Sequence, residues 1–251
     1  MRFISFSCLF LLASLAQAAS LYVTNTGYID QSHGYQGSSK DQFSGYLDNE
    51  FGTVSTGGLN DLQAMLEHDA LWVTLHDQSR VLTTQETSNL DAFIATGRRV
   101  LMVGEHDSWD VWNTSMLSVV GATAVNYNPL GCCSGTASSV ATHELLTGVS
   151  TVKFQAGGII DDVGSGLLLF DQAVAALWGD NVLGLMDLSF ITDPQYGQGS
   201  TNITAGDNAQ FASNTATWLA GSAAVPVPAA AWLFGSALTG LGFLRRRRNT
   251  P

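Results

Sequence analysis

The sequence predicts an α/β fold in which a mostly parallel β-sheet is covered by helices on both faces. Two short apolar segments, residues 70–75 and 100–103, have the composition of strands that are buried on both sides. The segment between them has the length and periodicity of a crossover helix. This strand, helix and strand order favours a parallel sheet. A composition of 45% hydrophobic and 12% charged residues indicates a folded globular domain and not a disordered chain.

The elements before this unit can be taken in order. Residues 21–24 predict the first strand, and residues 42–51 predict a helix. The helix is indicated by Phe43, Tyr46, Leu47 and Glu50, which recur at helical spacing. Residues 54–56 predict a short strand and residues 59–66 a second helix.

The crossover helix has recognisable start and stop signals. Thr83 is followed three residues later by Glu86, an order that is typical of a helix N-terminus. Leu90, Phe93 and Ile94 continue the apolar face, and Gly97 ends the helix.

The second half of the domain repeats the alternation less regularly. Residues 111–120 predict a helix, and strands are expected at residues 122–125, 152–154, 167–170, 173–178 and 182–186. The last helix is expected at residues 207–219, with Asp207 as its N-cap and with Phe211, Thr215, Trp218 and Leu219 facing the core.

The N-terminus has the pattern of a secretory signal peptide. Arg2 precedes the apolar residues 3–15, and Ala16-Gln17-Ala18 follows as a small-residue cleavage site. We therefore expect residues 1–18 to be removed and the exported chain to begin at Ala19.

The C-terminus, residues 223–251, differs sharply from the domain. Pro226 and Pro228 keep the linker extended, and the apolar run at residues 229–244 would rise about 24 Å as a helix, enough for a thin bilayer. Arg245, Arg246, Arg247 and Arg248 follow and predict a cytoplasmic end, which leaves the domain outside. A buried core helix is the less favoured alternative, because the run has no polar stripe.

This order of proline linker, apolar span and basic cluster resembles the PEP-CTERM sorting signal. Val227 stands where the motif that names the signal has Glu. The resemblance covers about the last tenth of the chain. It implies a Gram-negative bacterium that makes exopolysaccharide, and an exosortase that removes the tail in the inner membrane. This chain would be the substrate of that enzyme.

The domain itself, residues 19–222, resembles the class I glutamine amidotransferase-like superfamily, including its flavodoxin-like and trehalose-utilisation-type relatives. The resemblance rests on residues 69–104, on residues 143–149 with their histidine before a Gly-Val pair, and on the final helix at residues 207–219. It implies a nucleophilic cysteine after the strand at residues 100–103. Here that strand is followed by Gly104-Glu105-His106-Asp107, without a cysteine, and His143-Glu144 lacks the residue that separates the family's His-x-Glu pair. The sequence therefore excludes glutamine hydrolysis by this mechanism.

Polar residues follow both of the apolar strands that define the fold. His76 and Asp77 come after the first strand, and Glu105, His106 and Asp107 come after the second. Open α/β sheets bind ligands at the carboxyl ends of their strands, so we expect these five side chains to share one edge, where Asp187 could join them. Imidazoles and carboxylates could bind a divalent metal or a sugar there. The simpler interpretation, which we favour, is that they cap helices or face water.

Charge and cysteine content narrow the possible partners further. Only five of the ten basic residues lie between the two tails, against all 21 acidic residues, which excludes a nucleic-acid partner. After removal of Cys8 with the signal peptide, Cys132 and Cys133 remain, either as a strained vicinal disulfide or as free thiols. Neither has a basic neighbour that would make it a reactive nucleophile. No cofactor is implied.

Three functions are compatible with these observations. The first is an exported, exosortase-sorted protein of the envelope or extracellular matrix with a non-catalytic domain that binds a ligand or exopolysaccharide. The second is an extracellular hydrolase that acts on saccharides through the strand-end His, Asp and Glu residues. The third is a structural or adhesive component of the matrix.

Overall fold

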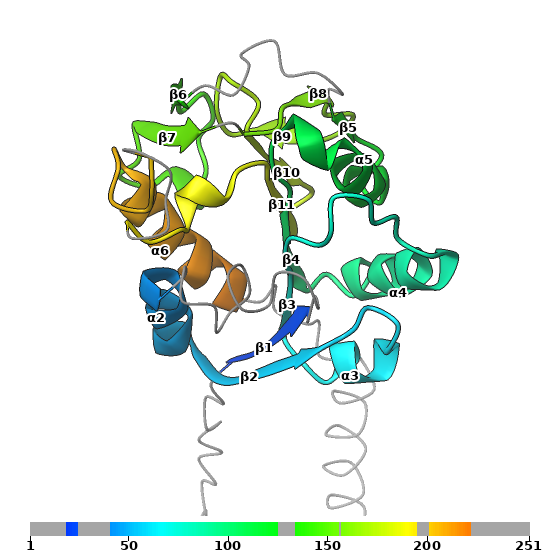
Figure 1. Ribbon diagram of the computed structural model, residues 1–251. Helices are drawn as coiled ribbons and strands as arrows, with labels where there is room; N and C mark the ends of the chain where they lie inside the picture. The colour runs from blue at the N-terminus through cyan, green and yellow to red at the C-terminus, as the bar shows by residue number, and fades with distance from the viewer. Residues whose placement is uncertain (1–18, 25–40, 125–133, 156, 195–200, 222–251) are drawn as a thin grey trace, which may run out of the picture.

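The computed structural model describes residues 19–24, 41–124, 134–155, 157–194 and 201–221 (Figure 1). The predicted signal peptide, the pair Cys132 and Cys133, and the predicted sorting tail lie outside the described residues. Among the residues that are described, no helix is long and apolar enough to cross a membrane.

The centre of the domain is a seven-stranded sheet in the order β2-β1-β3-β4-β11-β10-β9. The strands are β1 (Ala19–Thr24), β2 (Phe51–Gly57), β3 (Ala70–Val73), β4 (Arg99–Val103), β9 (Leu167–Leu168), β10 (Ala175–Trp178) and β11 (Val182–Leu185). The five strands from β2 to β11 are parallel, whereas β10 and β9 are antiparallel additions at one side. The predicted mostly parallel sheet is confirmed.

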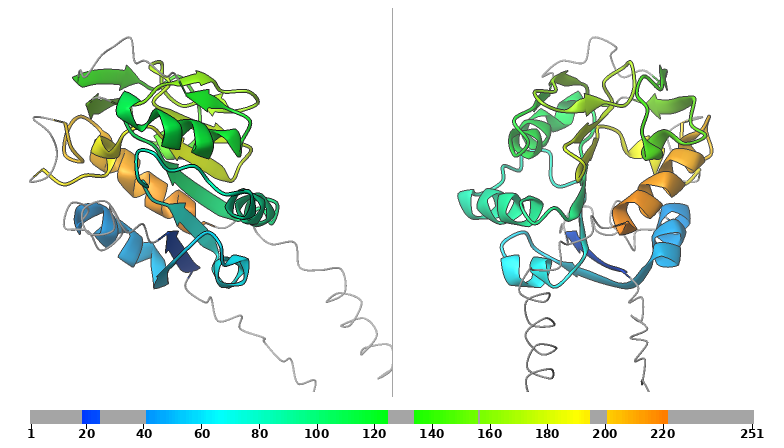
Figure 2. Two further views of the ribbon diagram at one scale, coloured as in Figure 1. Left: turned by 45° about the vertical axis from the view of Figure 1, so that its right-hand side comes forward. Right: turned by 180° about the vertical axis from the view of Figure 1, so that it is seen from behind.

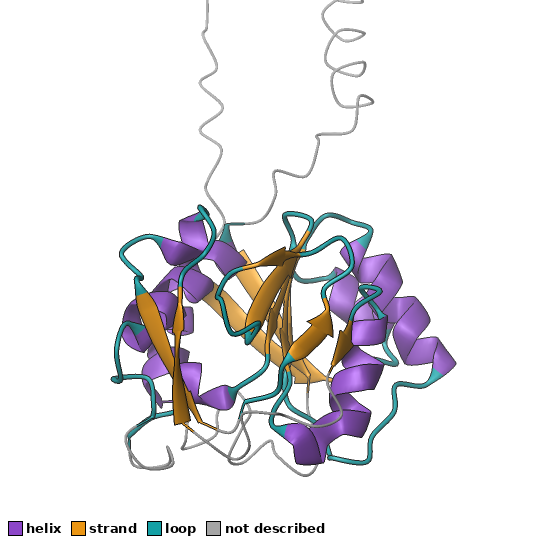
Figure 3. Cartoon of the chain, turned by 90° about the horizontal axis from the view of Figure 1, so that it is seen from above, coloured by secondary structure: helices purple, strands orange, loops and turns teal. Residues whose placement is uncertain are grey.

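Helices cover both faces of this sheet, as Figures 1 and 2 show. One face carries α2 (Asp41–Glu50) and α6 (Asn208–Ala220), which pack against each other. The other face carries α3 (Leu62–Leu66), α4 (Thr84–Ile94) and α5 (Asp110–Ser118). The view along the sheet in Figure 3 shows the three layers.

The crossover helix α4 forms as its sequence predicts. Thr83 Oγ1 accepts a hydrogen bond from Glu86 N at 3.2 Å, and the Glu86 carboxylate accepts one from Thr83 N at 2.9 Å. This reciprocal capping box satisfies two amides that a helix N-terminus would otherwise leave unpaired. Leu90 and Phe93 of the same helix are fully buried against the sheet.

Several predicted elements form but are placed or bounded differently. The expected strands near residues 122–125 and 152–154 do not join the central sheet. They are β5 (Thr123–Ala124), which pairs with β8 (Ile160–Asp162), and β7 (Thr151–Gln155), which pairs with β6 (Ser134–Ser138). Periodicity in the sequence marks a strand but not its partner, because the partner is chosen by tertiary packing.

One helix start and one predicted cap also differ from the prediction. The helix expected from residue 59 begins at Leu62, because Asp61 is its N-cap and accepts a hydrogen bond from Ala64 N. Asp207 stands at the N-cap position of α6 but does not cap it. Its carboxylate instead accepts hydrogen bonds from Ser150 N and Thr151 N, at 2.8 and 3.0 Å.

The strand ends form two edges of the sheet, which differ in composition. The carboxyl edge is formed by the ends of β1, β3, β4 and β11 and the residues that follow them. The basal edge is formed by the starts of β1, β3 and β4 with the end of α6. The two ends of the described domain meet at the basal edge, since Ala19 and Gly221 line the same hollow.

Candidate functional site

The predicted strand-end residues follow neighbouring parallel strands. β3 and β4 pair directly, with Val73 opposite Met102, so no strand separates them. His76 and Asp77 therefore follow the same edge of the sheet as Glu105, His106 and Asp107. The predicted topology is confirmed, and it extends to Asp187, because β11 is the other parallel neighbour of β4.

His76 is a buried, uncharged imidazole. Its ring centroid lies 4.5 Å from that of Trp112 on α5, whose indole nitrogen donates to Val103 O. Burial, and secondarily the charge of Arg80, lower the pKa of His76 from 6.5 to about 3. The side chain is 5% exposed, and within the described part of the chain its Nε2 atom has no hydrogen-bond partner. Such groups are rare in folded proteins and each needs an explanation.

Asp77 does not join His76. It is exposed, and its carboxylate accepts hydrogen bonds from the hydroxyl and the amide of Ser79, which together lower the pKa of Asp77. The geometry is that of a carboxylate that stabilises its own turn. For this residue the simpler interpretation of the sequence is the better one.

Glu105 occupies a tightly constructed turn after β4. Its amide donates to Asn113 Oδ1 at 3.1 Å, and its carbonyl accepts from Asn113 Nδ2 at 2.6 Å. Two glycines make room for it. A Cβ on Gly104 would lie 2.6 Å from Asn113 Oδ1, and one on Gly158 would lie 2.6 Å from Glu105 O. Asn113, Gly104 and Gly158 thus fix the position of the Glu105 backbone.

The Glu105 carboxylate is directed to the short 3-10 helix η4 (Leu188–Phe190). It accepts hydrogen bonds from His106 N at 3.1 Å and from Leu188 N at 3.4 Å. Asp187 accepts from the next amide, Ser189 N, at 2.6 Å. Two carboxyl groups from neighbouring strands therefore meet at the first turn of one helix.

Asp187 is an unusual carboxyl group because it is 1% exposed. Besides Ser189 N, it accepts a hydrogen bond from Gln155 N at 2.6 Å. Burial raises the pKa of Asp187 to about 7 in spite of these hydrogen bonds, which act to lower it. Near neutral pH this side chain can therefore hold or release a proton.

The remaining predicted residues of this edge are His106 and Asp107. His106 is half-buried, and its Nδ1 accepts a hydrogen bond from Ser108 N at 3.2 Å. Asp107 begins the 3-10 helix η2 (Asp107–Trp109), and its side chain lies outside the description. Among the described residues, no group of three or more His, Cys, Asp or Glu side chains is arranged to hold a metal ion.

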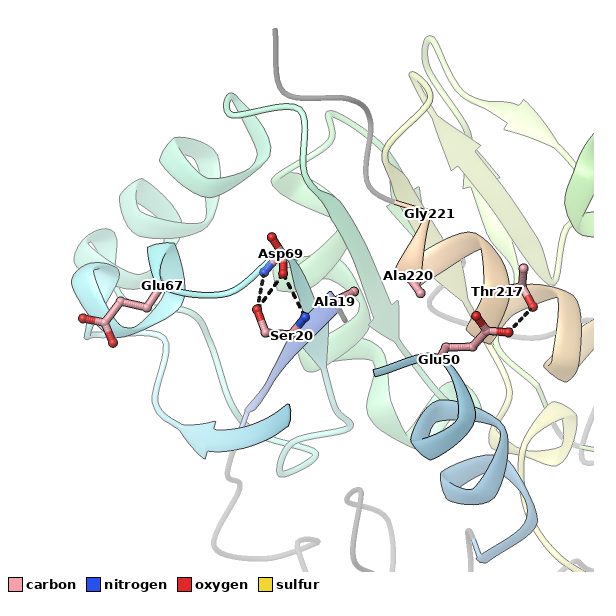
Figure 4. Close-up of a pocket in the computed structure, with 8 residues that line it drawn as sticks. All are labelled: Ala19, Ser20, Glu50, Glu67, Asp69, Thr217, Ala220 and Gly221. Atoms are coloured by element: carbon pink, nitrogen blue, oxygen red, sulfur yellow. Dashed lines mark hydrogen bonds between the residues drawn. The ribbon is translucent and has the colours of Figure 1, made fainter. Parts of the chain in front are cut away.

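A hollow of about 550 Å³ lies at the basal edge, away from these residues. Figure 4 shows its lining, with Ser20 bonded to Asp69 on one side and Glu50 bonded to Thr217 on the other. Its walls are mostly polar side chains with their own partners. We place the candidate site at the carboxyl edge, since the two largest pKa shifts among the described residues, those of His76 and Asp187, occur there.

Sequence reasoning missed Asn113, which positions Glu105, and gave Asp187 only a minor part. An asparagine on the inner face of a helix that follows a strand-end carboxylate was an available signal for the first. The second could not be found from sequence, because the burial of Asp187 depends on β7 and on Gly157, which lie far from it in the chain.

Comparison with known proteins supports the fold and not a function. No family model and no curated protein matches the chain. Solved structures do resemble it, and three of them illustrate the likeness. A glutamine amidotransferase from Methylobacillus flagellatus is 7% identical, with a TM-score of 0.58 over 81% of this chain and 94% of that one. The N-terminal domain of mmIFT52 is 10% identical, with a TM-score of 0.61 over 81% and 98%. A ThuA-like protein from Bacteroides uniformis is 8% identical, with a TM-score of 0.51 over 82% and 93%.

At such low identity these likenesses establish architecture alone. The described domain has the flavodoxin-like fold of the glutamine amidotransferase-like and ThuA-like proteins, with a glutamate, Glu105, following the central strand β4 and its Gly104.

Proposed function

We propose that the chain is an exported protein of the bacterial envelope or extracellular matrix, and that its α/β domain binds a ligand without catalysing a reaction. Residues 1–18 direct export and are removed by signal peptidase. Residues 223–251 hold the chain in the inner membrane until an exosortase cuts there. The observation that carries the binding function is the carboxyl edge, where the half-buried Glu105 occupies a rigid turn and its carboxylate lies beside Asp187 at the start of η4.

The arrangement of the two edges supports this proposal. Both ends of the described domain lie at the basal edge, where Ala19 and Gly221 line one hollow. A domain tethered through the linker after Gly221 would therefore turn its carboxyl edge away from the membrane. That edge is the one at which open α/β sheets bind ligands.

The chemistry of the carboxyl edge favours an uncharged ligand that is rich in hydroxyl groups. The half-buried Glu105 can accept hydrogen bonds from hydroxyls, and the buried His76 adds no charge because its pKa is about 3. The acidic surface would repel polyanions, since the chain between the two tails contains five basic and 21 acidic residues. A neutral exopolysaccharide fits these requirements.

Binding to neutral bacterial exopolysaccharide, measured by isothermal titration calorimetry, tests the proposal. We expect Glu105→Gln to weaken binding about tenfold, the loss of one hydrogen bond, and His76→Phe, which replaces a buried ring, to have a smaller effect. Glu67→Gln, an exposed acid at the basal edge, is the matched control and should bind as the wild type does. Equal binding by all three variants would place the ligand elsewhere.

Processing can be checked separately by intact-mass measurement of the protein from its native envelope or medium. The finished protein should begin at Ala19 and lack the segment from Trp232 to Arg248. Retention of that segment would indicate an ordinary membrane anchor and would contradict sorting.

A second candidate, a saccharide hydrolase, is favoured by one observation. Asp187, with a pKa of about 7, and Glu105 lie at the same turn, and glycoside hydrolysis uses two carboxyl groups, of which the acid has a raised pKa. Release of reducing sugar ends from the polysaccharide, lost in Glu105→Gln, would support the hydrolase over the binding protein.

A further inference from the structure

We propose that the α-ammonium group created by removal of the signal peptide forms an ion pair with Asp69. Signal-peptide removal would then add a positive charge at the basal edge of the sheet. The proposal rests on the cleavage after Ala18 that is part of the proposed function. It assigns a role to a carboxylate and a hollow that ligand binding at the carboxyl edge does not use.

The position of the new terminus is fixed by the sheet. Ala19 is the first residue of β1 and pairs with Phe51 of β2. Two residues later, Leu21 pairs with Ala70 of β3 on the other side. Because β1 is held between two parallel strands, Ala19 N has little freedom to move away from the basal edge.

The Asp69 carboxylate is hydrogen-bonded to Ser20, the residue next to Ala19. Its Oδ2 atom accepts hydrogen bonds from Ser20 N at 2.8 Å and from Ser20 Oγ at 2.7 Å. The Asp69 amide in turn donates to Ser20 O at 2.9 Å. These contacts orient the carboxylate towards the start of β1, but every one of its donors is neutral.

Asp69 has no cationic partner in the described part of the chain, where the ion pairs are Arg80 with Glu86 and Arg99 with Glu144. The hollow that Ala19 and Asp69 line is also lined by Glu50 and Glu67, and none of its described lining residues is Lys or Arg.

Asp69 is the best-placed of these acids. Figure 4 shows the Glu67 side chain directed away from Asp69, while Glu50 accepts a hydrogen bond from Thr217 Oγ1 at 2.8 Å. Before cleavage, Ala19 N belongs to an uncharged peptide bond. After cleavage it becomes an ammonium group that supplies the missing positive charge, and a nearby carboxylate stabilises the charged form of an amine.

The test is the pKa of the Ala19 α-amino group, followed by NMR of the 13C-methylated amine. The chain from Ala19 to Pro251 is prepared in detergent by removing an N-terminal tag with a protease that leaves no extra residue. An unperturbed α-amino group has a pKa of about 7.7–8.0. We expect a value higher by about half a unit or more, and its return to the ordinary range in Asp69→Asn.

Two controls keep the ion pair distinct from loss of structure. Ser20→Ala and Glu67→Gln retain the Asp69 carboxylate and should keep the raised pKa. One extra glycine before Ala19 displaces the ammonium by up to about 3.6 Å and leaves the domain sequence unchanged, so it should restore an ordinary pKa. An ordinary pKa in the unaltered chain, or a raised pKa that survives Asp69→Asn, overturns the proposal.

The outcome is independent of the export proposal, because the tag is removed in vitro. An ordinary pKa on a native protein that begins at Ala19 overturns the ion pair alone. A native N-terminus at another residue overturns the cleavage site, and with it the biological role of the pair.

Discussion

The polar groups at the two edges of the central sheet differ in their hydrogen bonding and burial. At the basal edge, Ser20 bonds to Asp69, Glu50 to Thr217, and Arg99 to both Glu144 and the Trp218 carbonyl. At the carboxyl edge, the buried His76 ring has an unpartnered Nε2 and Asp187 is a fully buried carboxyl group. Arg99 Nε and Trp218 Nε1 at the basal edge also lack partners, but the two largest pKa shifts among the described residues, those of His76 and Asp187, belong to the carboxyl edge. Shifts of this size are typical of functional groups.

The contrast is visible along a single strand, β4. Arg99 at its start lies over the Trp218 ring, 5.0 Å from the ring centroid, and donates to the end of α6, where a cation is favoured. Its Nε atom lacks a partner, but both of its terminal nitrogens are bonded. Glu105, just beyond the other end, is fixed by Asn113 and turned towards a second carboxyl group. The predictions below test whether this difference between the edges is real.

The largest effect is expected for Asn113→Leu. Asn113 is 1% exposed, and its loss leaves the amide and carbonyl of Glu105 without their partners. At about 1–3 kcal/mol for each unsatisfied buried group, the free energy of unfolding should fall by about 2–4 kcal/mol. Urea denaturation measures it, with the exposed Asn49→Leu on α2 as a control that should change little. A fall below about 1 kcal/mol would show that Asn113 does not hold the Glu105 turn.

The next effect is a change in pH dependence for His76→Phe. The pKa of His76 is lowered in the folded state to about 3, so the unfolded chain binds the proton more readily. The stability contributed by the neutral ring is complete above the unfolded pKa of about 6.5 and is lost as the pH falls towards 3. Between pH 7 and pH 5 the wild type should lose about 2 kcal/mol more than the variant, measured by denaturation at each pH.

Asp187 acts in the opposite sense, because its pKa is raised to about 7. Its contribution to stability is present below about 3.8 and declines as the pH rises towards 7. It is common to the wild type and His76→Phe and cancels in their difference. Identical pH profiles for the two proteins would mean that His76 is not a buried neutral ring.

A smaller loss is expected for Thr74→Val, which changes a buried contact at the carboxyl edge without changing its shape. Thr74 Oγ1 donates to Thr24 O at 2.9 Å and lies 3.0 Å from Thr24 Oγ1. Valine leaves the Thr24 carbonyl without this donor and the Thr24 hydroxyl without this acceptor, so the free energy of unfolding should fall by about 1–2 kcal/mol.

The matching change at the basal edge, Thr217→Val, should have the smallest effect. Thr217 is exposed, and water can replace its hydrogen bond to Glu50. The free energy of unfolding should stay within about 0.5 kcal/mol of the wild type. Equal losses for Thr74→Val and Thr217→Val would remove the distinction between the two edges.

Much of the fold could be predicted because local signals and tertiary packing agree. Thr83 and Glu86 indicate the start of α4 from neighbouring residues alone, and the structure contains that capping box. The apolar sequences of β3 and β4 fit only strands that are buried on both faces of a sheet. The short crossover between them makes the two strands neighbours. The pairing of the strands after residue 120 could not be predicted, because β5 and β7 pair with distant segments, Ile160–Asp162 and Ser134–Ser138.

The sequence by itself determined which residues share the carboxyl edge, since the polarity of parallel strands places His76 and Glu105 on one side of the sheet. It also determined that no cysteine directly follows the strand β4. Only the tertiary structure decided which of these side chains are buried. Asp77 lies in water, whereas Asp187 is enclosed and its pKa is raised to about 7. Burial depends on what packs over a residue from elsewhere in the chain, and desolvation by that packing sets the chemistry of a carboxyl group.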